Sequence, residues 1–106
     1  MLCKKGKLFL KEIIKQKYKH RSEVIKALAH PARLFMIDFL SDGEKCVCKF
    51  TEELGLDQST VSKHLAVLKN TGLVEFEKRG LNVYYRLKCP CILDIFKCIE
   101  SVNKPK

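Results

Sequence analysis

The sequence lacks several features that define large classes of proteins. It has no tryptophan, and its three prolines and five glycines are too few for a collagen-like or low-complexity chain. No apolar run approaches the length needed to span a bilayer, so neither a membrane protein nor a membrane partner is expected. A glycine-rich phosphate loop and a pair of carboxylates flanking an evident cleft are also missing, so the sequence does not predict an enzyme.

An export signal is not recognisable either. The N-terminus, MLCKKGKLFLKEIIKQKYKHR, has basic residues throughout and no uninterrupted apolar stretch followed by a small-residue cleavage site. The protein is therefore expected to be cytoplasmic. In that reducing compartment its six cysteines are predicted to be thiols with a metal-binding or redox role, rather than structural disulfides.

Acidic residues are scarce relative to basic ones. The 21 lysines and arginines exceed the 12 acidic residues, which gives a formal charge of +9 and a pI near 9.4. Such an excess favours a polyanionic partner, nucleic acid ahead of a membrane surface, because counterion release drives binding to phosphates. The alternative is that the charge only keeps the protein soluble.

The chain of 106 residues is long enough for one domain but not for two, so residues 1–106 are expected to form a single unit. Its first part, 1–20, is predicted to be a helical arm, because apolar residues recur there close to helical spacing among lysines. A second short helix is expected over 21–29, capped by Ser22. Pro31 is expected to begin a third helix, which is apolar almost all round and should be buried on several sides.

Residues 46–70 are predicted to form a helix-turn-helix unit. Val47, Phe50 and Leu54 follow helical spacing over a short segment that a glycine can end. Asp57 can cap a second helix from residue 58 to about 70. The buried stripe expected on that helix consists of Val61, Leu65 and Leu68. Two short helices separated by a tight glycine-containing turn, the second with a polar outer face, are typical of this motif.

From residue 73 the apolar pattern changes from helical to alternating spacing. Residues 73–87 are predicted to form a β-hairpin that serves as a wing, with its loop at Arg79-Gly80-Leu81-Asn82. A last helix over 91–102 carries an apolar stripe, which is assigned to a dimer interface together with the N-terminal helix. The predicted fold is mainly α with a small β-hairpin wing: a winged helix-turn-helix protein, dimeric through its N- and C-terminal helices.

The second helix of the helix-turn-helix unit is the predicted DNA-reading element, since its N-terminal half enters the major groove in this motif. The side chains expected to project from that half are Ser59, Thr60, Ser62 and Lys63. His64 is expected either to face DNA beside these residues or to lie half-buried near the turn. Lys78 and Arg79 at the hairpin tip are expected to reach an adjacent minor groove or the backbone. The alternative is that both surfaces are only solvated.

Four stretches together resemble the ArsR/SmtB family of metal-sensing winged helix-turn-helix repressors. They are ALAHPARL (27–34), EKCVC (44–48), QSTVSKHLAVLKNTGLV (58–74) and NVYYRL (82–87). The resemblance implies a cytoplasmic homodimer that binds an inverted-repeat operator in double-stranded DNA, represses resistance or efflux genes, and is released by a toxic metal or metalloid. The residues that match the family's recognition-helix pattern, and so inherit its DNA-contact role, are Gln58, Ser59, Ser62, Lys63 and His64.

Two cysteines, Cys46 and Cys48, flank one valine at the start of the helix-turn-helix unit. Residues i and i+2 of a regular helix point about 200° apart, but in extended or irregular backbone they point to the same side. The pair is therefore expected at a helix start that is frayed, or that frays when one ion binds both sulfurs. Soft thiolates admit arsenite, antimonite, cadmium, lead or zinc as that ion. No cofactor is expected to be required for folding.

The resemblance also suggests how such a site is completed. A CVC pair at this place implies the arsenite- and cadmium-sensing site of the family, and therefore its arsenic-responsive branch. In one branch a third cysteine follows three residues after the pair, where this chain has Thr51. In another branch an N-terminal cysteine of the opposite subunit completes the site, and Cys3 is placed to do so. The alternative is that Cys3 is a thiol without a role.

A second group of cysteines, Cys89, Cys91 and Cys98, forms an alternative metal site. Cys91 and Cys98 are expected on one face of the last helix but about 10.5 Å apart along its axis, so a single protomer cannot easily hold one ion with both. Two antiparallel helices in a dimer could bring the three thiols together, unless Cys98 is only a small apolar residue in the interface. A thiol redox or persulfide sensor on the same scaffold is the alternative function.

Overall fold

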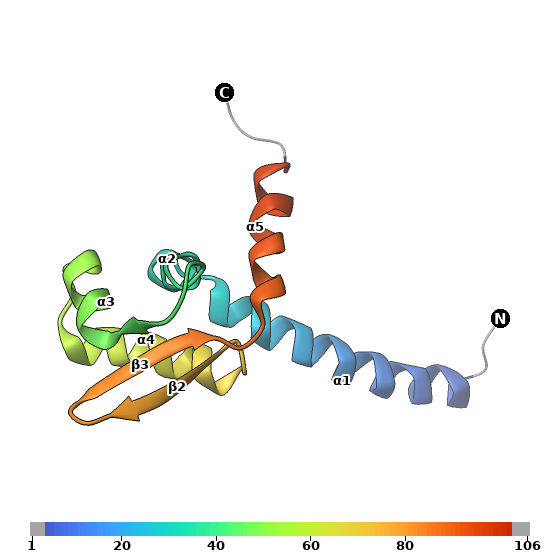
Figure 1. Cartoon of the computed structure of the whole chain (residues 1–106). Coiled ribbons are helices and arrows are strands. Elements are labelled where there is room, and N and C mark those ends of the chain that lie inside the picture. Colours follow the sequence, from blue (N-terminus) through green and yellow to red (C-terminus); the bar gives the residue numbers. More distant parts are fainter. Residues whose placement is uncertain (1–3, 103–106) are drawn as a thin grey trace.

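The computed structural model describes residues 4–102, and its side chains from residue 11 onward (Figure 1). The elements in chain order are α1 (Lys4–Leu28), α2 (Pro31–Phe39), β1 (Lys45–Cys46), α3 (Val47–Leu54), α4 (Gln58–Asn70), β2 (Val74–Arg79), β3 (Asn82–Leu87), a 3₁₀ turn (Pro90–Ile92) and α5 (Leu93–Glu100). The fold is mainly helical, and one three-stranded antiparallel sheet forms the wing.

The N-terminal segment forms one helix rather than the two that the sequence predicts. Ser22, the expected cap of a second helix, lies inside α1 and donates its hydroxyl to the Lys19 carbonyl at 3.0 Å. A serine can make this local bond without ending a helix, and no proline or glycine interrupts residues 7–30. The break comes at His30, whose Nδ1 accepts from the Ala32 amide at 3.1 Å, with Pro31 at the first position of α2.

The hydrophobic core lies where α2, α3 and α4 meet. The residues with no exposed surface are Met36, Ile37, Phe50, Val61, Leu65 and Leu68. The predicted stripe on α4 is therefore confirmed. The expectation that α2 is buried on several sides is only partly right, because 37% of Phe35 is exposed. That residue lines a groove of about 460 Å³ with Phe96 and Ile99 of α5.

A tight turn joins α3 to α4. Gly55 ends α3 in the left-handed conformation, at φ 65°, and donates its amide to the Thr51 carbonyl at 3.0 Å. Glycine adopts this conformation without a steric penalty, so the chain can reverse within three residues. Asp57 then caps α4, as predicted, by accepting from the Thr60 amide. Together α3 and α4 form the helix-turn-helix unit.

The wing contains one more strand than the predicted hairpin. β2 and β3 pair in antiparallel fashion from Val74↔Leu87 to Arg79↔Asn82, and Gly80, at φ 61°, permits the two-residue turn between them. β1 pairs with the other edge of β3, so the strand order is β1-β3-β2. Because β1 has only two residues, its sequence shows no alternation that could have revealed it.

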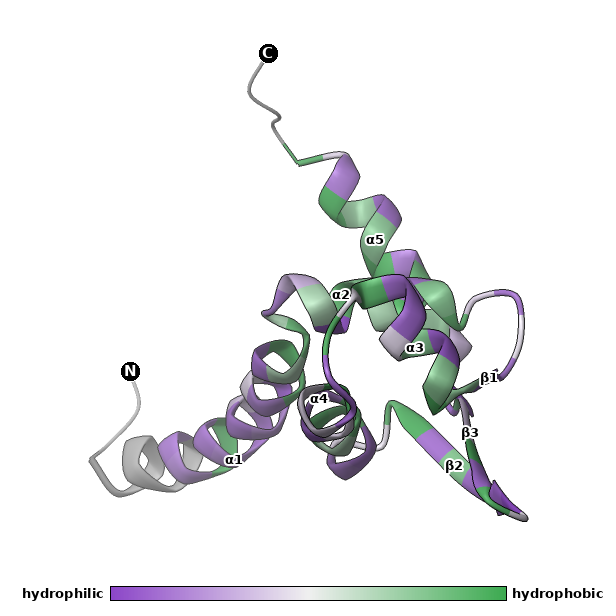
Figure 2. Ribbon diagram, turned by 90° about the vertical axis from the view of Figure 1, so that its left-hand side faces the viewer, coloured by the Kyte–Doolittle hydropathy of each residue, from purple (hydrophilic) through white to green (hydrophobic). Residues whose placement is uncertain are grey.

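The two terminal helices project from the winged helix-turn-helix unit (Figure 1). The radius of gyration is 17.7 Å, against about 13 Å for a compact domain of 100 residues. Apolar residues line much of α5, whereas α1 is more polar (Figure 2). The large apolar side chains left exposed on these helices include Ile13, Ile14, Tyr18, Ile95 and Ile99. None of the helices in the described part is long and apolar enough to cross a membrane.

Candidate DNA interface and thiol site

α4 presents a polar face away from the core. Its apolar stripe packs inward, which leaves the side chains on the opposite side of its first two turns in solvent: Gln58, Ser59, Ser62 and Lys63 are all exposed. The N-terminal end of a helix also carries partial positive charge from its unpaired amides. This surface can therefore accept phosphates and offer hydroxyl, amide and ammonium groups to base edges.

Thr60 has a structural partner. It is half-buried, and its hydroxyl donates to Asp57 Oδ1 at 2.6 Å while its amide bonds to Oδ2 at 3.4 Å. The hydroxyl bond from Thr60 lowers the pKa of Asp57 below its ordinary value. Thr60 thus completes the N-terminal cap of α4, and its predicted contact with DNA would require this hydroxyl to serve both partners.

His64 lies half-buried and contacts Arg33 of α2 and His30 just before it. Its Nδ1 accepts from Arg33 Nε at 3.1 Å, and its ring centroid lies 4.5 Å from that of His30. Burial, and then the nearby His30 and Arg33, lower the pKa of His64. Arg33 also donates to the Ala27 carbonyl at 3.3 Å. Arg33 of α2 thus connects α4, through His64, to the end of α1, through Ala27. The sequence of α4 alone could not have predicted this role of His64, because its partners lie outside α4.

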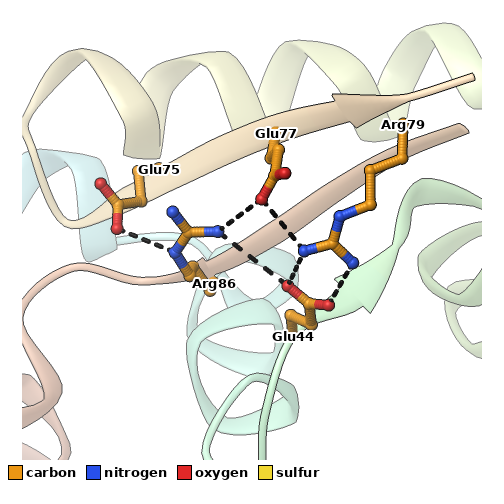
Figure 3. Close-up of polar contacts among 5 residues, drawn as sticks. All are labelled: Glu44, Glu75, Glu77, Arg79 and Arg86. Carbon is orange, nitrogen blue, oxygen red and sulfur yellow. Dashed lines mark hydrogen bonds and ion pairs between the residues drawn. The ribbon is translucent and has the colours of Figure 1, made fainter.

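Arg79 at the end of β2 belongs to an ion-pair network across the wing (Figure 3). Its guanidinium donates to both oxygens of Glu44, at 2.5 and 3.0 Å, and to Glu77 at 3.0 Å. Arg86 of β3 donates to Glu75 at 2.9 Å and to Glu77 at 3.3 Å. The predicted DNA contact of Arg79 must therefore compete with two carboxylates, whereas the side chain of Lys78 is exposed.

The same network ties the start of the helix-turn-helix unit to the wing. Glu44 directly precedes β1, and its bond from Arg79 lowers the pKa of its carboxyl. Cys46, the second residue of β1, pairs with Tyr84 of β3. The backbone around Cys46 is thus held at two points: Cys46 itself pairs with β3, and Glu44 forms an ion pair with Arg79. Sequence reasoning missed this connection, because it joins residues 35 apart along the chain.

The cysteine pair lies at the start of α3. Cys46 is the N-cap, with extended backbone at φ −69° and ψ 148°, and Cys48 lies in the first helical turn. Since only the second residue is helical, both sulfurs turn to the same side. Cys48 Sγ donates to Cys46 Sγ at 2.7 Å, and the Cys48 amide bonds to the same sulfur at 3.4 Å. The thiol bond raises the pKa of Cys48.

The pair lines a groove of about 490 Å³ between the helix-turn-helix unit and the wing. Cys46 is half-exposed and Cys48 is exposed. The groove is also lined by Thr51 of α3, by Gln58 and Ser62 of α4, and by Leu81, Asn82, Val83 and Tyr85 of the wing. Within residues 4–102, no three side chains of histidine, cysteine, aspartate or glutamate converge to hold a metal ion. The predicted third ligand, Cys3, lies outside the described residues.

The alternative cysteine group is dispersed within one chain. Cys91 lies in the 3₁₀ turn rather than in the last helix, so the prediction that it shares a helical face with Cys98 is wrong. The proline at residue 90 opens that turn, and the regular helix begins only at residue 93. Cys89, Cys91 and Cys98 are all exposed, and Cys89 Sγ lies 3.8 Å from the Gly72 carbonyl. A site made of these three would need a second copy of the chain.

The helix-turn-helix unit, the exposed polar face of α4 and the three-stranded wing define a winged helix-turn-helix DNA-binding protein. Residues 30–75 match the family model described as "Bacterial regulatory protein, arsR family". The chain belongs to the ArsR family of helix-turn-helix transcriptional regulators, which are not enzymes.

Three similar proteins illustrate the range of the family. An uncharacterized HTH-type transcriptional regulator of Methanocaldococcus jannaschii is 34% identical over 88 residues, 82% of this chain and 99% of the relative. The arsenical resistance operon repressor of Staphylococcus xylosus is 39% identical over 86 residues, 81% and 83% of the two chains. A homodimeric winged helix-turn-helix DNA-binding domain from Mycobacterium bovis superimposes with a TM-score of 0.72 at 32% identity, covering 82% and 81%.

Proposed function

We propose that this protein is a repressor that binds an inverted-repeat operator as a homodimer and is released when a thiophilic ion binds Cys46 and Cys48. Arsenite or antimonite is the favoured inducer, with cadmium, lead and zinc as further candidates. The observation that supports this most directly is the 2.7 Å approach of the two sulfurs at the start of α3. Their groove also contains Gln58 and Ser62 of the proposed DNA-reading helix.

The geometry of the pair suits one soft centre. Two sulfurs bound at about 2.3 Å in a tetrahedral arrangement lie about 3.8 Å apart. The observed sulfurs are closer than that, so a small rotation of two exposed or half-exposed side chains opens them enough. Arsenous acid would form two As–S bonds, each thiol proton leaving with an arsenic hydroxyl as water. The remaining hydroxyl stays on arsenic or is replaced by a third thiol.

One route to release is an ion that prefers a conformation that the operator does not. Cys46 is shared between β1 and the N-cap of α3, so moving its sulfur acts on both the wing and the helix-turn-helix unit. α3 is joined to α4 by only three residues. A change in the first turn of α3 can therefore reach the proposed DNA-reading surface through a short connection.

The proposed dimer would use α1 and α5. These helices leave isoleucines 13, 14, 95 and 99 between 39% and 52% exposed in the single chain. Exposed apolar side chains grouped on projecting helices are typical of an interface that a second copy covers. An inverted-repeat operator would then match the two-fold symmetry of the protein.

The experiment that tests the inducer is a release titration. An operator duplex selected from a random pool by the protein is labelled, and its anisotropy is followed while arsenite, antimonite, cadmium, lead or zinc is added under reducing conditions. Thiolates admit all five ions, and arsenite or antimonite should release the duplex at the lowest concentration if the chain shares the inducer of the arsenical resistance repressors that it resembles. If none of the five ions releases it and polysulfide without reductant does, the ion proposal is wrong.

That last outcome would support the second candidate, a thiol redox or persulfide sensor. It is favoured by the five described cysteines, four of which are exposed. Two thiols would lose two protons and two electrons to an oxidant and form one disulfide. The raised pKa of Cys48 does not separate the two candidates, because the thiolate is both the redox-reactive form and the form that binds a metal.

Replacing Lys63 by glutamine is expected to weaken operator binding and its salt dependence. Lys63 is exposed on α4, where its ammonium can neutralise a phosphate. Each lost phosphate contact lowers the slope of log K against log salt by about 0.9, and a dimer loses two. The measurement is the operator Kd at several salt concentrations. Lys88→Gln, at the base of the wing, is the matched control. An unchanged slope in the Lys63 variant would contradict the placement of α4 on DNA.

A further inference from the structure

The groove between α3, α4 and the wing is lined both by residues of the proposed DNA-binding surface and by the two thiols. Gln58 and Ser62 come from the proposed DNA-reading face of α4, and Leu81 and Asn82 form part of the hairpin tip. Cys46 and Cys48 line the same space. The thiols therefore lie on the side of the molecule that presents α4 and the wing, and not on a remote surface.

DNA geometry indicates what occupies such a groove. Adjacent major and minor grooves of a duplex are separated by one phosphodiester backbone. A recognition helix in one groove and a wing tip in the next must straddle that backbone. The space between α4 and the wing is then the path of the strand. The lining is compatible with phosphates, because within the described part of the chain it contains no carboxylate, and Thr51, Gln58 and Asn82 offer polar groups.

We propose that the operator backbone and the ligand of the Cys46–Cys48 pair compete for this one groove. Bound DNA shields both thiols, and a ligand on the thiols blocks the strand, so no complex contains both. The ligand half of this inference rests on the proposed function, whereas the shielding half depends only on where DNA binds. Competition of this kind is reciprocal: saturating DNA excludes the ligand, and saturating ligand excludes DNA.

The test is a thiol footprint on the full chain. N-ethylmaleimide is added for short times with and without the selected operator duplex, and each cysteine is quantified by peptide mass spectrometry. Cys89 and Cys91 are internal controls, since they are exposed and do not line the groove. Labelling of Cys46 and Cys48 should slow by about tenfold or more in the complex, within the usual range of coupling between sites, while the controls change by less than a factor of two. Raising the salt until the duplex dissociates should restore the rate.

Adduct size provides a second measurement. In a variant with Cys3, Cys89, Cys91 and Cys98 replaced by serine, so that only Cys46 and Cys48 remain, a thiomethyl group or a bulkier maleimide adduct is placed on the pair. Competition predicts that the operator Kd rises with the size of the adduct. The proposal would be overturned if Cys46 and Cys48 were labelled at the same rate with and without the operator, or if the operator Kd did not depend on the size of the adduct.

The outcomes separate this inference from the proposed inducer. Freely reactive Cys46 and Cys48 in the complex, together with an arsenite response that needs both, would overturn competition and leave the sensor in place. Shielded thiols, together with an arsenite response that survives their replacement by serine, would support competition for the groove and move the sensor elsewhere.

Discussion

Replacing Cys46 and Cys48 together by serine is expected to remove the arsenite response of operator binding. In the unsubstituted protein, arsenite should raise the operator Kd by about tenfold or more, as is usual for coupling between two ligands. Serine has the shape of cysteine with a smaller, polar end group, and it offers a hard oxygen that soft ions do not select. The variant's Kd should therefore be nearly the same with and without arsenite. The measurement is the ratio of these two values for each protein.

The matched control replaces the other described thiols, Cys89, Cys91 and Cys98, by serine. This variant should keep the full arsenite response, because in one chain the three are dispersed and none lines the groove. The reverse pattern, with the response lost in the control and kept in the Cys46/Cys48 variant, would place the sensor at the base of the wing and α5. A lost response in both would indicate that the two groups act together across the dimer.

Replacing Phe50 by alanine is expected to lower the free energy of unfolding by about 3–5 kcal/mol. The side chain is completely buried and packs edge-on against Phe39, with ring centroids 5.3 Å apart. Its removal leaves a cavity where α2, α3 and α4 meet. The measurement is urea unfolding followed by circular dichroism, at a single protein concentration because a dimer's stability depends on concentration.

Leu81→Ala is the matched control for this experiment. Leu81 is fully exposed at the hairpin turn, so its truncation should change the free energy of unfolding by less than about 0.5 kcal/mol. A Phe50 variant within 1 kcal/mol of the parent, by contrast, would mean that the core tolerates the loss, contrary to the observed packing.

The position of Phe50 also bears on how the thiols act. It follows Cys48 by two residues, so the helix is anchored in the core immediately after its exposed first turn. A ligand on the cysteines can rearrange that first turn at small cost, but shifting the rest of α3 would disturb the core. A ligand confined to the groove, with limited movement of α3, fits this arrangement better than unwinding of the whole helix.

The sequence predicted much of the helix-turn-helix unit because local rules control it. The stripe of Val61, Leu65 and Leu68, the cap at Asp57 and the stop at Gly55 each depend on residues within a few positions of one another. The hairpin followed from alternation and from a glycine at its turn. Several independent local features of this kind occur within each short segment and predict the same element, and the structure contains the elements that they predict.

The errors share a different cause. Ser22 offered a plausible cap, but it lies inside an uninterrupted helix, because serine can also bond within a helix. The strand at Lys45–Cys46 exists only because it pairs with β3. The Arg79–Glu44 ion pair forms only when the wing folds next to the loop before β1. Thr60 and His64 remain predicted DNA contacts, but the sequence did not reveal the bonds that they make to Asp57 and Arg33 within the protein.

By itself, the sequence determined the two helices of the helix-turn-helix unit, the buried stripe of α4 and the chemical groups available: an excess of basic residues, a polar face on α4 and two cysteines separated by one residue. Only the tertiary structure decided where those thiols lie relative to α4 and the wing. Periodicity reports the environment along one element, whereas a groove is formed by segments distant in sequence that packing brings together. The 2.7 Å approach of the sulfurs likewise depends on β1 pairing, which holds Cys46 extended at the point where the helix begins.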